Sequence, residues 1–141
     1  MQSIISFEKV KELLPQKFPF VMVHKLLEHD EDSIITSLLI EEDNIFCHNG
    51  VFSESGLIEH LAQSVALHTG YDFFVKNEAA PVGYIGTINN LTISKLPKLG
   101  QTLQTNVKIV TEFMGVTLVE GEVTCEDEVV LSAKMKTFIA G

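Results

Sequence analysis

The sequence contains no arginine, so all ten of its basic residues are lysines, against 19 aspartate and glutamate residues. The formal net charge is −9. This balance argues against nucleic-acid binding, which relies on a basic surface and on bidentate arginine contacts. An acidic surface also repels anionic membranes, so we expect no membrane partner.

Cysteines and long apolar runs are scarce as well. The two cysteines, Cys47 and Cys125, are too few for a disulfide framework or a zinc ribbon. No apolar run approaches the roughly 18 residues that a membrane-spanning helix needs. The N-terminus lacks a basic region followed by an apolar core, so it does not resemble a signal peptide. We therefore expect a cytoplasmic protein.

Hydrophobic residues make up 45% of the 141 residues and charged residues 21%, as in ordinary globular proteins. This length fits one hydrophobic core, and we expect a single domain over residues 1–141. No nucleotide-binding loop, flavin motif or metal cluster is visible, so the sequence predicts neither a cofactor nor a metal site. His60 and His68 stand eight apart, whereas a zinc-binding pair on a helix prefers a spacing of four.

The hydrophobic pattern of the first half predicts a short helix and two strands. The apolar spacing over 7–14 favours a helix that Pro15 ends. Strand-like segments follow at 21–29 and 34–41, and residues 44–50 are predicted to be a loop.

One strong helix is expected over 57–68, with Gly70 as its C-terminal stop. Apolar residues cover most of its circumference, which indicates burial on most sides. Four further strands are predicted at 83–95, 101–113, 116–125 and 129–139. This order predicts an α+β protein in which an antiparallel six-stranded sheet wraps around one long central helix.

A carboxylate within this apolar helix requires a reason. Glu59 shares a helix face with Gln63, four residues on. A buried carboxylate is uncommon without a partner or a catalytic task, so Glu59 is the first candidate for a functional residue. The alternative is a structural glutamate that is hydrogen-bonded at an interface.

Three segments resemble motifs of the FabZ/FabA-type 3-hydroxyacyl-ACP dehydratases, which have the hotdog fold. They are Leu14-Pro15-Gln16-Lys17-Phe18-Pro19-Phe20, Glu59-His60-Leu61-Ala62-Gln63, and Gly83-Tyr84-Ile85-Gly86 followed by Leu96-Pro97-Lys98-Leu99-Gly100. Their order and gaps agree with the family over roughly residues 7–138. The resemblance implies a hotdog fold and an active site at a dimer interface.

In that family, a histidine of one subunit faces an acidic residue on the central helix of the other. Loss of water from a 3-hydroxyacyl thioester needs a base for the Cα proton and an acid for the departing hydroxyl group. Glu59 matches the acidic position. The family's histidine loop is longer than the loop here by about three residues, and the nearest histidine is His48. His48 is either the base, brought back by the shorter loop, or an exposed histidine beside the Asn49-Gly50 turn signal.

The loop is also similar to that of the ApeP-like dehydratase-like branch found with aryl polyene pigments. Gly50, Glu59 and Ala62-Gln63 match that branch without gaps, although its loop proline and tryptophan are replaced by Ser53 and Ser55. The resemblance implies that Gln63 supports Glu59 or lines the tunnel mouth. It also implies that amides near Gly56 bind the thioester oxygen at the helix N-terminus.

We therefore predict a hydro-lyase that dehydrates a 3-hydroxyacyl thioester in fatty-acid or polyene biosynthesis, with Glu59 and His48 as catalytic residues. The substrate would be bound to an acyl carrier protein or to CoA. A carrier protein is acidic, so its binding would need a local patch of lysines, such as Lys95, Lys98 and Lys108. The expected assembly is a homodimer or a larger oligomer of dimers. The alternatives are a hotdog acyl thioesterase, or a non-catalytic hotdog subunit that pairs with an active dehydratase.

Overall fold

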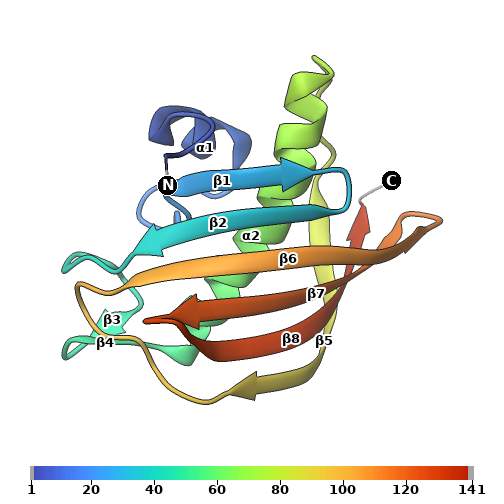
Figure 1. Cartoon of the computed structure of the whole chain (residues 1–141). Coiled ribbons are helices and arrows are strands. Elements are labelled where there is room, and N and C mark those ends of the chain that lie inside the picture. The colour runs from blue at the N-terminus through green and yellow to red at the C-terminus, as the bar shows by residue number, and fades with distance from the viewer. Residues whose placement is uncertain (1, 140–141) are drawn as a thin grey trace.

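A computed structural model describes residues 2–139 (Figure 1). Six strands form one sheet in the order β1-β2-β6-β7-β8-β5, and every neighbouring pair is antiparallel. The strands are β1 (Lys25–Asp30), β2 (Ser33–Leu39), β5 (Gly83–Ile93), β6 (Thr102–Phe113), β7 (Val116–Cys125) and β8 (Glu128–Ile139). The predicted α+β class and the six-stranded antiparallel sheet are confirmed.

The long helix α2 (Glu54–Val75) runs along one face of this sheet, which curves around it (Figure 1). Ser53 caps the helix, because its hydroxyl group accepts from the amide of Gly56. Leu57, Leu61 and Leu67 are fully buried against the sheet. The short helix α1 (Phe7–Leu13) packs against α2. Enclosure on both sides explains why apolar residues surround most of α2.

The prediction that Gly70 ends the central helix is wrong, since α2 continues to Val75. Gly70 is buried, and the backbone of Leu13 at the end of α1 packs directly against it. A Cβ atom at Gly70 would lie 2.7 Å from that oxygen. Here glycine permits the close approach of two chain segments, and it does not act as a helix stop.

The predicted loop over 44–50 is also wrong in part. A two-stranded hairpin forms from β3 (Cys47–His48) and β4 (Val51–Phe52). Asn49 and Gly50 both have positive φ, at 52° and 77°, which is the geometry of a two-residue type I′ turn. The hairpin is held to the loop before β6, because Phe52 donates to the carbonyl of Pro97 and Leu99 donates to that of Gly50.

The first strand begins at Lys25, four residues later than predicted. Residues 21–24 precede the strand, and Met22 and Val23 are buried there. The amide and carbonyl groups of Met22 bond to side chains of α2. The apolar residues that predicted a strand at 21–24 thus lie in a segment that is hydrogen-bonded to α2 and is not part of the sheet.

The opposite edge of the sheet is formed by β5, and nearly all of its side chains are exposed. Tyr84, Ile85 and Leu91 are among the exposed apolar residues on this strand. One backbone edge of β5 therefore pairs with β8 while the other carries no partner strand in the part of the chain described here. Within residues 2–139, no helix has the length and apolarity to cross a membrane.

Candidate functional site

A cavity of about 950 Å³ lies between α2 and the sheet. Its walls come from α2, the end of α1 with the segment that follows it, and the ends of β5, β6, β7 and β8. Glu59 lines this cavity. The wall around Glu59 includes the small apolar residues Ala62, Val65 and Ala66 of the same helix. Around Glu59, such a cavity can hold an apolar chain beside the carboxyl group, and the other acidic residues of the lining come from other elements or from later turns of α2: Glu12, Glu31, Asp32, Asp72 and Glu112.

The side chain of Gln63 fixes the carboxylate of Glu59. Its amide nitrogen donates to Oε2 of Glu59 over 2.7 Å and to the carbonyl oxygen of Phe20 over 2.7 Å. Its amide oxygen accepts from the amide of Met22 over 2.6 Å. Both amide hydrogens of Gln63 are thereby used, and the residue is completely buried. Gln63 therefore supports Glu59.

His60 completes the attachment of Met22 to α2. Nδ1 of His60 donates to the carbonyl oxygen of Met22 over 2.6 Å, and Nε2 accepts from the hydroxyl group of Thr105 over 2.6 Å. Burial lowers the pKa of His60 from 6.5 to about 4, so the imidazole is neutral at physiological pH. A buried histidine with both nitrogens occupied holds structure together. No local pattern around His60 indicates this hydrogen bond, because Thr105 is 45 residues away in the sequence.

His48 is exposed in the β3–β4 hairpin and is not among the residues that line the cavity. Gly56 is buried in the first turn of α2, and its amide donates to the hydroxyl group of Ser53 over 3.2 Å. A Cβ atom at Gly56 would lie 2.6 Å from the ring of Phe52, so packing explains the glycine. Glu59 and Gln63 thus meet at one site within the chain, while His48 lies outside the cavity.

Two other histidines, one on β1 and one in the C-terminal half of α2, stack against each other. The rings of His29 and His68 are stacked, with their centroids 4.7 Å apart. Nε2 of His68 donates to the carbonyl oxygen of Asp30, and Nε2 of His29 donates to that of His68. Burial lowers the pKa of His29. These contacts join β1 to α2.

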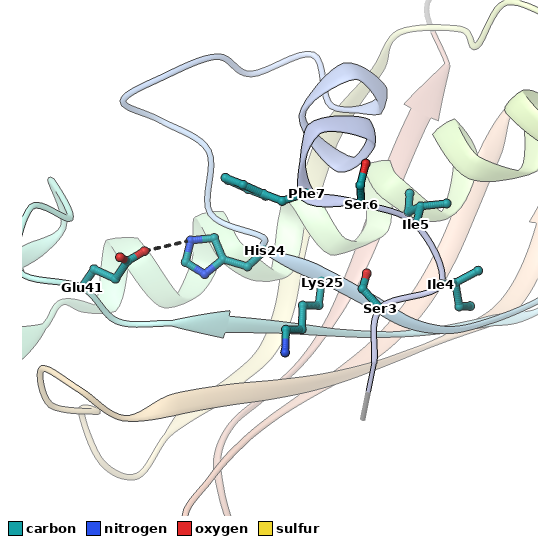
Figure 2. Close-up of a pocket in the computed structure, with 8 residues that line it drawn as sticks. All are labelled: Ser3, Ile4, Ile5, Ser6, Phe7, His24, Lys25 and Glu41. Atoms are coloured by element: carbon teal, nitrogen blue, oxygen red, sulfur yellow. Dashed lines mark ion pairs between the residues drawn. The ribbon is translucent and has the colours of Figure 1, made fainter.

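The fifth histidine lies in a second pocket of about 660 Å³ beside the start of β1 (Figure 2). His24 faces Glu41 there, with Nε2 3.4 Å from the carboxylate, and its ring meets that of Phe7 edge-on. Nδ1 of His24 accepts from the amide of Leu39. Burial lowers the pKa of His24, against the opposite effect of Glu41. Glu59 does not line this pocket, so His24 is not part of the same site.

Comparison with known proteins agrees with this architecture. A curated relative, the 3-hydroxyacyl-[acyl-carrier-protein] dehydratase FabZ of Oceanobacillus iheyensis, is 26% identical over 143 residues, covering 93% of this chain and 100% of the relative. The dehydratase heterocomplex ApeI:P from Xenorhabdus doucetiae superposes with a TM-score of 0.86 at 17% identity, covering 94% of this chain and 91% of that one.

A hypothetical thioesterase with coenzyme A from Streptococcus pneumoniae TIGR4 has a TM-score of 0.67 at 13% identity, covering 83% of this chain and 85% of that one. These likenesses show that the chain has the hotdog fold. The model of the ApeP-like family, described as ApeP dehydratase, matches residues 8–140. The protein belongs to the ApeP-like dehydratase family.

Proposed function

We propose that this protein is a hydro-lyase that converts a 3-hydroxyacyl thioester into the enoyl thioester and water. The observation that carries the proposal is the position of Glu59 on the wall of the 950 Å³ cavity, where Gln63 orients its carboxylate. Membership of the ApeP-like dehydratase family supports the same class of reaction.

In this reaction, Glu59 is the acid that protonates the leaving hydroxyl group, and His48 of the facing subunit is the base that removes the Cα proton. The C–O bond breaks as the Cα electrons form the double bond, and the hydroxyl group leaves as water with the proton from Glu59. We assign the thioester oxygen to the N-terminal end of α2 beside Gly56, where the helix dipole stabilises negative charge. The amide of Gly56 exchanges its bond to the Ser53 hydroxyl group for one to this oxygen, and the amide of Ser55 lies beside it.

The base is assigned to a second subunit because the other histidines of the chain are unsuited to the task. Only His68 lines the cavity with Glu59. It stands nine residues further along α2, about 14 Å away along the helix axis, and it donates to Asp30. His48 is exposed on a hairpin, where a neighbouring subunit can be reached.

The unpaired edge of β5 supports a dimer. A second copy that adds its own β5 would continue the sheet and cover exposed apolar side chains such as Tyr84 and Ile85. We propose a homodimer, or a larger oligomer built from such dimers, in which each site takes Glu59 from one subunit and His48 from the other.

An acyl carrier protein or CoA delivers the substrate in this proposal. Lys98 is exposed, and its backbone forms a β-bridge with Val51, next to the turn that follows His48. Lys95 is exposed a few residues before it, whereas Lys108 pairs with Ser33 at the other end of β2 and lies away from this hairpin. Lys95 and Lys98 are the groups we assign to a phosphopantetheine phosphate or to the acidic face of a carrier protein.

A second candidate function is that of a non-catalytic subunit that pairs with an active dehydratase. It is favoured by the position of His48 outside the cavity and by the similarity to a structure described as a dehydratase heterocomplex. A thioesterase is the third candidate, because a carboxylate that lacks a histidine partner in its own chain can activate water for thioester hydrolysis. The similar fold of the coenzyme A-bound hypothetical thioesterase favours it.

The test is mass spectrometry of a panel of 3-hydroxyacyl carrier proteins incubated with the wild-type protein, with Glu59→Gln and with Glu54→Gln. Glu54 is the matched control, because it is an exposed glutamate on the same helix. We expect the wild-type protein and Glu54→Gln to remove the mass of one water from the acyl chain, and Glu59→Gln to fail.

The other outcomes identify the alternatives. Release of free acid and thiol would show a thioesterase. An unchanged panel would argue against both enzyme functions and in favour of a subunit that needs a hotdog partner. Full dehydratase activity of Glu59→Gln would refute the role assigned to Glu59.

A further inference from the structure

Two buried threonines join the sheet to α2. Thr105 of β6 and Thr36 of β2 are directly opposite each other in the antiparallel register of the two strands, and both are completely buried. Thr105 bonds to Nε2 of His60 over 2.6 Å, and Thr36 bonds to the hydroxyl group of Ser64 over 2.8 Å. His60 and Ser64 are four residues apart, so they share a face of α2. The two threonines therefore make parallel contacts to one face of the helix.

The contact of Thr105 begins a hydrogen-bond network that ends at Glu59. The neutral ring of His60 has one N–H group, which Nδ1 donates to the carbonyl oxygen of Met22, so Nε2 accepts from Thr105. The amide of Met22 donates to Oε1 of Gln63, and Nε2 of Gln63 donates to Glu59. Each of these four bonds is 2.6 or 2.7 Å long. A strand of the sheet is thereby connected to the carboxylate.

The contact of Thr36 ends at the backbone of the helix. The hydroxyl group of Ser64 donates to the carbonyl oxygen of His60 over 2.9 Å, so the bond between the two hydroxyl groups takes its hydrogen from Thr36. Neither hydroxyl group bonds to Gln63 in the described part of the chain. Thr36 thus matches Thr105 in residue type, burial and register, but it has no connection to the carboxylate through side chains.

The network fixes geometry more than it adds stability. Replacing both partners of a buried hydrogen bond by apolar groups of the same shape can leave stability nearly unchanged, whereas a fully bonded polar network specifies one arrangement. Met22 is held on both sides in this arrangement, because His60 binds its carbonyl group and Gln63 binds its amide. A shift of Met22 would therefore turn the carboxamide of Gln63, and with it the carboxylate of Glu59.

We propose that Thr105 and His60 are positioning residues for the dehydration, and that they hold the carboxylate of Glu59 in its orientation through Met22 and Gln63. Neither Thr105 nor His60 lines the cavity, so they act through the network and do not touch the substrate. This proposal rests on the proposed function, since it requires Glu59 to be the acid. It extends the catalytic site from α2 to the central part of the sheet.

The test compares Thr105→Val, which keeps the shape of the side chain without its hydroxyl group, with Thr105→Ser and Thr36→Val. Rates are measured with the 3-hydroxyacyl carrier protein of the panel that the wild-type protein dehydrates fastest. We expect Thr105→Val to lower kcat about 10-fold and to leave KM within about 2-fold of wild type, because proton donation contributes in the transition state only. Thr105→Ser keeps the hydroxyl group and should retain the wild-type kcat.

Thr36→Val is the matched control. It should lower the urea midpoint about as far as Thr105→Val does, and yet keep the wild-type kcat. Thr105→Ala also lacks the hydroxyl group and has the same expected kcat as Thr105→Val, so the test does not depend on the folding of one variant. Equal losses of kcat in Thr105→Val and Thr36→Val, or none in either, would overturn this inference.

The side-chain carboxamide signal of Gln63 gives a second measurement that needs no substrate. It is observed by NMR of nitrogen-labelled protein and assigned by its absence in Gln63→Met. We expect the signal to shift in Thr105→Val and to stay in place in Thr36→Val. A signal unmoved in both would show that the network does not transmit the change, and it would overturn the inference. A wild-type protein without dehydratase activity would overturn the proposed function and this inference together, whereas an active wild-type protein, an inactive Glu59→Gln and an unchanged Thr105→Val would overturn this inference alone.

Discussion

Glu59 and Gln63, one turn apart on α2, are joined by a 2.7 Å hydrogen bond from the carboxamide nitrogen to Oε2 of the carboxylate. The same carboxamide accepts from Met22 and donates to Phe20. The orientation of the carboxylate is thereby coupled to the segment before β1. In the proposed reaction, Oε2 accepts from Gln63, so the proton that Glu59 donates resides on Oε1.

Replacing Gln63 with methionine should lower both stability and turnover. The change keeps a side chain of similar length but removes three hydrogen bonds, and it leaves the buried amide of Met22 without an acceptor. We expect a loss of about 1–3 kcal/mol in the free energy of unfolding, measured by urea denaturation. We also expect kcat to fall while KM changes little, because Glu59 loses its orientation.

The control for this variant is Gln104→Met, at an exposed position of β6. It should leave both stability and kcat near the wild-type values. A Gln63→Met protein with normal kcat would show that Glu59 needs no orientation by Gln63, even if its stability were reduced.

The pKa of His60 predicts how stability depends on pH. The folded protein takes up a proton on His60 only near pH 4, whereas the unfolded chain does so near 6.5. Between these values the unfolded state binds more protons, so stability is fully present above pH 6.5 and is lost as the pH falls toward 4. The loss from this residue is about 3 kcal/mol. It is measured by urea denaturation at a series of pH values.

His60→Gln should flatten this pH dependence, although the variant is less stable at neutral pH. His24 and His29 have pKa values lowered by burial and retain a smaller loss in the same direction. The control is Gln104→Met, which changes an exposed residue of β6 without a titratable group and should keep the wild-type slope. An unchanged slope in His60→Gln would mean that another group takes up the proton.

The close contact at Gly70 predicts a penalty for alanine within a helix, where alanine is normally preferred. The added Cβ would lie 2.7 Å from the carbonyl oxygen of Leu13, and backbone cannot move aside as easily as a flexible side chain. We expect Gly70→Ala to lose about 1–2 kcal/mol after the gain in helix propensity is included. Gly83→Ala, where the nearest atom would be at 3.6 Å, should be nearly neutral. Equal stabilities, measured by thermal unfolding, would contradict this packing.

These contacts also mark the limit of what the sequence could predict. Periodicity locates the strands and the central helix because it records which side chains face the core, and Glu59 stands out there as a carboxylate in an apolar helix. The same pattern misplaces the start of β1, since the apolar residues 21–23 would look alike in a strand or in a segment tied to α2. The residues around Gly70 in the sequence do not indicate its contact with the Leu13 carbonyl, because that contact joins residues far apart in the chain.

The relation between His48 and Glu59 crosses the subunit boundary in the proposed dimer, and it predicts complementation. Glu59→Gln and His48→Gln should each be inactive alone. When the two are refolded together in equal amounts, half of the dimers are mixed, and each mixed dimer has one site with both residues intact and one with neither. We expect about one quarter of the wild-type dehydratase activity.

Differently tagged subunits, purified through both tags in sequence, isolate the mixed dimer and raise the expected activity to about one half of wild type. A mixed dimer of Glu59→Gln with Glu59→Gln/His48→Gln is the control, and it should be inactive because neither of its sites has Glu59. If His48→Gln alone were active, His48 would not be the catalytic base. Inactive mixed dimers beside an active wild-type protein would place Glu59 and its base in the same subunit, because every chain of the mixture then lacks one of them.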